Sequence, residues 1–277
     1  MALIHHVVEG QGAPPLVFVH GFGCDRTDWA AQMAHFSPRH QTIAVDLRGH
    51  GLSPGAAADC SIERCGADVT EVMRAPDLRQ AVLIGHSMGC RIVIEAALQA
   101  PDRVAAVVLL DGSQFAPEMG AVLRQSFALP DGYATLTDSI FRQMFNARSD
   151  SAVAAAVIAR ARRLPQPIGE KMLADMQRYD VHRLAASMAS LRVPVMVVQC
   201  TYSNEKRERQ AMRMGQETPY LTMVCTNVPS ARVEIIPDTG HFPQLDAAGE
   251  TNALIESFVK DALRSVSLRS MSLRGAQ

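Results

Sequence analysis

The residues of this chain that most clearly suggest chemistry are a serine, a histidine and a short glycine-rich bend. Ser87 lies in the pattern Gly85-x-Ser87-x-Gly89, directly after the apolar run 81–84 and directly before a helical pattern. A serine at the apex of a sharp strand-to-helix turn has a strained backbone and needs small neighbours, which the two glycines provide. Such a turn pushes the hydroxyl clear of the sheet, at the positive end of the following helix. The segment therefore predicts a nucleophilic serine.

Two other segments supply what such a serine needs. A serine hydroxyl is a poor nucleophile at neutral pH, so it requires a base and a carboxylate that orients the base. His241 follows the short strand-like segment 233–236 and a loop, and it is the candidate base. The early apolar strand 16–19 ends in the glycine-rich bend 20–23. The backbone N–H groups of this bend are not used in hydrogen bonds between strands, so they could bind an oxyanion. Together the three segments predict nucleophilic catalysis by serine.

The order and the setting of these motifs resemble those of the α/β-hydrolase family, over most of the chain. Four motifs carry the resemblance, each after an apolar strand: His20-Gly21-Phe22-Gly23, the segment from Asp46 to Ser53, Gly85-His86-Ser87-Met88-Gly89 and Gly240-His241. The resemblance implies that Ser87 is the nucleophile and that His241 is the general base. It also implies that the N–H groups of Phe22 and Met88 form the oxyanion hole.

The carboxylate that orients His241 is where the sequence departs from the family pattern. The family usually places an aspartate in the loop after strand 193–198, but this loop contains none, and its nearest carboxylate is Glu205 in a charged run. Some members place the acid at the end of the preceding strand, where the run 107–110 is followed by Asp111. A carboxylate there lies at the same edge of the sheet as the turn that carries Ser87 (the nucleophile elbow) and the loop that carries His241 (the histidine loop). We therefore favour Asp111 over Glu205 as the acid.

The elements that must position these residues alternate between apolar strands and amphipathic helices. Strands are predicted near 3–8, 16–19, 42–45, 81–85, 104–110, 193–199 and 232–236, and helices over 27–36, 61–75, 88–100, 218–227 and 246–264. This alternation predicts an α/β fold with a mainly parallel sheet and helices on both faces. Ligands then bind at the carboxyl ends of the strands. We assign 1–112 and 193–264 to this α/β-hydrolase core.

Residues 113–192 are expected to form an inserted helical lid. They contain no convincing buried strand, and their prolines divide them into about four short helices. The family carries a lid at this position, where it would exclude water and shape an apolar pocket. The candidate substrate-binding residues are His20, Phe115, Phe141, Met144 and Phe145. Residues 265–277 are polar and basic and are expected to form a mobile tail.

The composition limits the partners and the location of the protein. The chain has 48% hydrophobic residues and a net charge of −1, so its charge gives no indication that it binds nucleic acid or a membrane. No run approaches the roughly 18 apolar residues of a spanning helix, and the start has no secretory pattern. The six cysteines have no metal or disulfide spacing, so we expect reduced thiols in a cytoplasmic protein with neither a metal nor a cofactor.

The predicted reaction is cleavage of an ester-like bond (ester, lactone, carbamate or amide) in a small, largely apolar substrate, through an acyl-enzyme on Ser87. A serine there argues against haloalkane dehalogenases and epoxide hydrolases, which use aspartate at this position of the family. Three alternatives remain open: a cofactor-free dioxygenase in which His241 deprotonates the substrate, a C–C bond hydrolase with the same triad, and a ligand receptor of the same fold. The oligomeric state also remains open.

Overall fold

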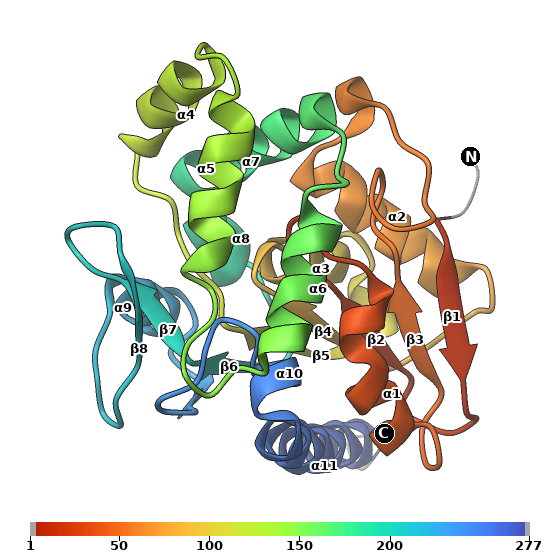
Figure 1. The fold of residues 1–277 in the computed structure, drawn as a ribbon. Helices are drawn as coiled ribbons and strands as arrows, with labels where there is room; N and C mark the ends of the chain where they lie inside the picture. The colour runs from red at the N-terminus through yellow and green to blue at the C-terminus, as the bar shows by residue number, and fades with distance from the viewer. Residues whose placement is uncertain (1–3, 275–277) are drawn as a thin grey trace.

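The computed structural model describes residues 4–274, apart from the side chains of residue 263 and of 265–274. Within these residues a seven-stranded sheet has helices on both faces (Figure 1). Its strands, in spatial order, are β1 His6–Glu9, β3 Thr42–Val45, β2 Leu16–Val19, β4 Ala81–His86, β5 Val104–Leu110, β6 Val195–Gln199 and β9 Arg232–Ile235. β1 pairs antiparallel with β3, and every other neighbouring pair is parallel. The predicted α/β fold with a mainly parallel sheet is confirmed.

The central strands are buried on both sides, which explains their continuous apolar sequences. In β2, Phe18 packs into one buried cluster, and Val17 and Val19 pack into the other. The cluster around Phe18 is covered by α1 Ala30–Phe36 and α11 Ala248–Arg274. The opposite cluster is covered by α2 Ile62–Arg74, α3 Met88–Gln99 and α9 Pro219–Asn227. The sheet is therefore the middle layer of three, and its strand ends carry the loops.

The helical insertion between β5 and β6 is confirmed. Residues 113–192, all of which the structure describes, form five helices: α4 Met119–Phe127, α5 Gly132–Arg142, α6 Ser151–Ala161, α7 Gln166–His182 and α8 Leu184–Ala189. We expected about four, and the difference arises because Arg183 has non-helical angles (φ −133°, ψ −35°) that separate α7 from α8. In Figure 1, α4, α5 and α7 lie on the side of the molecule opposite α11.

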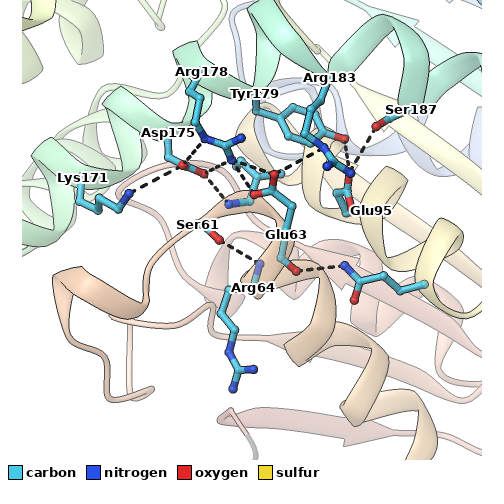
Figure 2. A network of polar contacts seen from close by, with 12 residues as sticks. Ser61, Glu63, Arg64, Glu95, Lys171, Asp175, Arg178, Tyr179, Arg183 and Ser187 are labelled. Carbon is cyan, nitrogen blue, oxygen red and sulfur yellow. Dashed lines mark hydrogen bonds and ion pairs between the residues drawn. The ribbon is translucent and has the colours of Figure 1, made fainter.

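A network of hydrogen bonds and ion pairs connects α7 and α8 to the core helices α2 and α3 (Figure 2). The buried carboxylate of Glu95 accepts hydrogen bonds from Tyr179 Oη at 2.9 Å and from Ser187 Oγ at 3.2 Å. Arg178 bridges the lid to the core, because its guanidinium donates both to Asp175 of α7 and to Glu63 of α2. These bonds fix the second half of the lid against the core.

The C-terminal part of the chain differs in extent from the prediction. A short helix, α10 Pro243–Asp246, follows the histidine loop, and α11 then continues to Arg274. The segment that we expected to form a mobile tail, 265–277, thus starts within α11 and is helical through Arg274; 275–277 lie outside the described residues. No helix within 4–274 is long and apolar enough to cross a membrane.

A short antiparallel hairpin after β6 was not predicted. β7 Thr201–Ser203 pairs with β8 Arg209–Ala211, so that Thr201 lies opposite Ala211 and Ser203 opposite Arg209. Its strands are too short and too polar to give an alternating apolar pattern. This hairpin contributes directly to the site described next.

Candidate active site

Ser87 occupies a strained turn between β4 and α3. Its backbone angles, φ 54° and ψ −111°, lie where side chains other than glycine are rarely found. A Cβ at Gly85 would lie 2.3 Å from the backbone oxygen of Gly89, and a Cβ at Gly89 would lie 2.3 Å from that of Val19. Both flanking glycines are therefore required by close backbone contacts, as the Gly-x-Ser-x-Gly pattern predicts.

Ser87, His241 and Asp111 form a continuous hydrogen-bonded line. His241 Nε2 lies 2.9 Å from Ser87 Oγ, and His241 Nδ1 lies 2.6 Å from Asp111 Oδ2. If Nε2 is to accept the serine proton, Nδ1 must carry the ring hydrogen and donate it to Asp111. Three segments far apart in the sequence thus bring a serine hydroxyl, an imidazole and a carboxylate together in the order that acyl transfer uses.

Asp111 is held by donors from the strand and hairpin beside it. Its Oδ1 accepts the N–H groups of Cys200 and Thr201, both at 2.7 Å, and its Oδ2 accepts the Thr201 hydroxyl at 2.5 Å. Burial raises the pKa of Asp111, while Arg209 and these hydrogen bonds act against that rise. The other candidate acid, Glu205, is exposed in the turn between β7 and β8. The structure brings Asp111, and not Glu205, to His241.

The glycine-rich bend after β2 lies against the serine. A Cβ at Gly21 would lie 3.1 Å from Ser87 Cβ, which is closer than most real Cβ contacts, so glycine suits this close approach of the bend. Phe22 follows in the bend, and Met88 is the first residue of α3, where a backbone N–H has no acceptor within the helix. The two residues predicted for the oxyanion hole therefore flank Ser87 from two separate segments.

His20, one of the residues proposed for substrate binding, makes hydrogen bonds that support this bend. Its ring is fully buried, and Leu47 N–H donates to Nε2 at 2.9 Å. Nδ1 therefore carries the hydrogen and donates it to the Gly21 carbonyl at 2.7 Å. With both ring nitrogens bonded to the backbone, His20 fixes the shape of the bend.

Three of the four apolar candidates from the lid lie beside the bend or the histidine loop. Phe141 packs with its ring 6.4 Å from that of Phe22. The carbonyl of Met144 accepts the backbone N–H of His241 at 2.7 Å. Phe145 stacks on Phe242, the residue after the histidine, at 5.0 Å between ring centroids.

The fourth candidate, Phe115, lies at the start of the lid beside a buried ion pair. Its ring lies 5.9 Å from the guanidinium carbon of Arg91, a residue of α3. Arg91 donates to Asp180 of α7 through Nε at 2.7 Å and Nη2 at 2.6 Å, and through Nη1 to the Ser87 carbonyl at 3.3 Å. Asp180 also accepts the Phe115 N–H at 2.7 Å. Phe115 thus belongs to the junction that joins the lid to the nucleophile helix.

Sequence reasoning missed Arg209, which reaches the histidine from β8. Its Nη1 lies 3.1 Å from His241 Nδ1 and donates to Thr201 Oγ1 at 2.6 Å. The same atom lies 3.8 Å from Asp111 Oδ2. In the sequence Arg209 ends a run of charges, 205–209, which is typical of a solvated turn and gave no sign that the side chain of one member is only 15% exposed.

The surroundings of His241 keep the imidazole neutral. Burial lowers its pKa well below the usual 6.5, and the guanidinium groups of Arg209 and Arg91 lower it further. His86, at the end of β4, packs beside it and donates from Nε2 to the His241 carbonyl at 2.7 Å. A neutral imidazole with a free Nε2 lone pair is the form that accepts a proton from serine.

A cavity of about 550 Å³ lies at the junction of the bend and the lid. It is lined by residues 23–27, 49–52, 160 and 163–165. Ser87, His241 and Asp111 are not among these lining residues of the described chain, and two of its arginines are already paired, Arg26 with Asp46 and Arg160 with Asp28. This cavity therefore does not lie over the serine, where we expected an apolar pocket.

Comparisons with known proteins agree with the geometry. The chain is 26% identical over 263 residues to the dihydrolipoyllysine-residue acetyltransferase component of the acetoin cleaving system of Pseudomonas putida, which covers 91% of this chain and 65% of that protein. This chain thus spans about two thirds of the length of that relative. It is 28% identical over 263 residues to the pimeloyl-[acyl-carrier protein] methyl ester esterase of Methylococcus capsulatus, covering 91% of this chain and 96% of that protein.

A solved structure and a family model complete the comparison. Est816, an N-acyl homoserine lactone degrading enzyme, superposes with a TM-score of 0.76 and 25% identity, over 92% of this chain and 96% of that chain. The model of the alpha/beta hydrolase family matches residues 16–254, from β2 into α11, and so includes the elbow, the lid and the histidine loop. The chain belongs to the alpha/beta hydrolase family.

Proposed function

We propose that this protein is a serine hydrolase that cleaves an ester-like bond of a small, largely apolar substrate. Ser87 is the nucleophile, His241 the general base and Asp111 the orienting acid. The observation that carries the proposal is the hydrogen-bonded line in which His241 lies 2.9 Å from Ser87 Oγ and 2.6 Å from Asp111 Oδ2. The strained angles of Ser87 support it, because such strain is found where a site requires it.

The first half of the reaction forms the acyl-enzyme. His241 Nε2 takes the proton of Ser87 Oγ as the oxygen attacks the substrate carbonyl. The oxyanion that develops accepts hydrogen bonds from the N–H groups of Phe22 and Met88. One such donor typically stabilises the transition state by about 2.7–4 kcal/mol. The imidazolium, stabilised by Asp111, then protonates the leaving alcohol or amine, and the tetrahedral intermediate collapses to the serine ester.

The second half releases the acid product. His241, again neutral, removes a proton from water as the water oxygen attacks the serine ester. The same two N–H groups bind the second oxyanion, and the proton on His241 returns to Ser87 Oγ as the product leaves. Ser87 is only 8% exposed and His241 only 1%, so the reacting groups are largely shielded from bulk water.

The substrate class is argued from the neighbours of the serine and from the relatives. Phe141, Met144 and Phe145 lie beside the bend and the histidine loop, and this favours an apolar acyl or aromatic group. Two of the proteins compared above, a methyl ester esterase and a lactone degrading enzyme, act on esters of carboxylic acids, open or cyclic. Esters and lactones are therefore the first substrates to test.

The test is a panel of short-chain esters, lactones, carbamates and amides with the wild-type protein and the Ser87→Ala variant. We expect turnover of at least one ester or lactone, and its loss by several orders of magnitude in Ser87→Ala. Ser190→Ala, which removes an exposed hydroxyl after α8, is the matched control and should retain wild-type rates. A folded Ser87→Ala protein that keeps most of the activity would contradict the acyl-enzyme and favour base chemistry by His241 alone.

A further inference from the structure

Arg209 brings a positive charge into the line of groups that ends at Ser87. It enters from the β7–β8 hairpin, and its Nη1 lies 3.1 Å from His241 Nδ1 and 3.8 Å from Asp111 Oδ2. The same nitrogen donates to Thr201 Oγ1 at 2.6 Å, and the Thr201 hydroxyl in turn donates to Asp111 at 2.5 Å. Hydrogen bonds thus reach Asp111 from two sides, from Arg209 through Thr201 and directly from His241.

The position of the ring hydrogen decides what Arg209 does. In the base form of His241, Nδ1 carries a hydrogen that points to Asp111, so Nδ1 has no lone pair for Arg209 to donate to. The guanidinium therefore faces a nitrogen that cannot accept from it, and it bonds to Thr201 instead. The contact at Nδ1 is electrostatic, and it disfavours a second positive charge on the imidazole.

Asp111 needs a counter-ion because its carboxylate is fully buried. Two cations could serve: a protonated His241 or Arg209. If His241 served, it would hold its proton on Nε2 and could not accept one from Ser87. If Arg209 serves, Asp111 stays ionised while His241 stays neutral.

The remaining polar groups around His241 do not replace Arg209. His86, at the end of β4, is buried, and burial lowers its pKa to about 3, so it adds no charge. Arg91, on α3, already forms a buried two-bond ion pair with Asp180 of α7. Ser87, on the elbow, is neutral. Among the side chains that the structure describes, the charges that face the imidazole without another partner of opposite sign are thus Asp111 and Arg209.

We propose that Arg209 is a positioning residue that acts as the resting counter-ion of Asp111 and thereby leaves His241 uncharged and free to act as the base. This inference rests on the proposed serine hydrolase function, because it assigns His241 the role of base. The counter-ion role explains why the residue at this position of the hairpin is an arginine, since arginine carries its charge at every physiological pH.

The test measures how the reactivity of Ser87 depends on pH. The acid limb of kcat/KM for an ester, and of the second-order rate of Ser87 labelling by a fluorophosphonate, reports the protonation of the base in the free enzyme. A unit charge within about 4 Å changes such a protonation equilibrium by roughly one pH unit at the dielectric constant of water, and by up to roughly three at the effective value of about 20 used for sites in proteins. We therefore expect Arg209→Gln to move both acid limbs to higher pH by at least about one pH unit.

Two further variants separate charge from structure. Arg209→Lys keeps the charge and should leave the acid limb within about 0.3 pH unit of the wild type. Arg207→Gln removes the same charge from the exposed turn of the same hairpin and should leave the limb unchanged. If Arg209→Gln has the wild-type acid limb, or if Arg209→Lys shifts as far as Arg209→Gln, the counter-ion role is refuted.

The wild-type protein gives a second check that does not depend on the folding of a variant. Its acid limb should lie below pH 6.5, the usual pKa of histidine, because His241 is neutral at rest. A wild-type limb at or above pH 6.5 would overturn the inference even if Arg209→Gln does not fold. Failure of the proposed function looks different: the wild-type protein would then neither label at Ser87 nor hydrolyse the esters.

Discussion

Replacing Asp180 by asparagine should destabilise the protein strongly, because it removes one partner of a buried ion pair. Arg91 and Asp180 are 1% and 0% exposed, and two short hydrogen bonds join them, from Nε at 2.7 Å and from Nη2 at 2.6 Å. In Asp180→Asn the guanidinium stays buried without its counter-charge, and the N–H of Phe115 loses a charged acceptor. Breaking a buried pair in this way costs about 3–5 kcal/mol.

The chain contains a matched control for this change. Arg162 and Asp138, both in the lid, form a pair of the same geometry, with bonds from Nε at 2.9 Å and from Nη2 at 2.6 Å, but its side chains are 55% and 32% exposed. Exposed pairs contribute little, because water competes for both charges. Asp138→Asn should therefore leave the free energy of unfolding almost unchanged.

The assay is equilibrium unfolding in urea, followed by circular dichroism, together with thermal unfolding. A loss of 3–5 kcal/mol corresponds to a fall in Tm of about 6–10 °C for a chain of this length, at roughly 2 °C per kcal/mol. If Asp180→Asn and Asp138→Asn lower the free energy of unfolding by the same small amount, the loss of one partner costs no more in the buried pair than in the exposed pair. That result would refute the prediction.

Two further predictions concern the site. Asp111→Asn should lower kcat by up to about 10⁴-fold, the loss that follows in a serine protease when the histidine takes the wrong tautomer, whereas Glu205→Gln should be nearly silent; the reverse order in steady-state kinetics would assign the acid to Glu205. Gly85→Ala should abolish both turnover and labelling by a fluorophosphonate, because its Cβ would lie 2.3 Å from the carbonyl oxygen of Gly89. Gly249→Ala is the control, because its Cβ would have no atom of the described residues within 4 Å. A fully active Gly85→Ala protein would contradict the requirement for glycine at this turn.

The parts of the site that follow buried strands could be predicted from the sequence. β4 and β5 are continuous apolar runs, so their ends are easy to locate, and Ser87 and Asp111 come directly after them. Because parallel strands end at one edge of a sheet, the sequence also indicates that these residues lie near each other. The glycines around Ser87 follow from the local geometry of one turn, which depends on few other residues.

The parts that depend on tertiary packing could not be predicted. Arg209 is covered because the β7–β8 hairpin folds back over the end of β5, and a run of charges carries no sign of that. The role of His20 depends on two backbone groups, one of them 27 residues away at Leu47.

The acyl-enzyme on Ser87 is the central claim, and intact-protein mass spectrometry tests it most directly. The protein is mixed with a short-chain p-nitrophenyl ester and quenched with acid within the first turnover, and the adduct is located by peptide mapping. We expect one acyl group per chain, on Ser87, together with a stoichiometric burst of p-nitrophenol, and neither in Ser87→Ala. Turnover without any adduct, at a rate that persists in folded Ser87→Ala, would contradict the account.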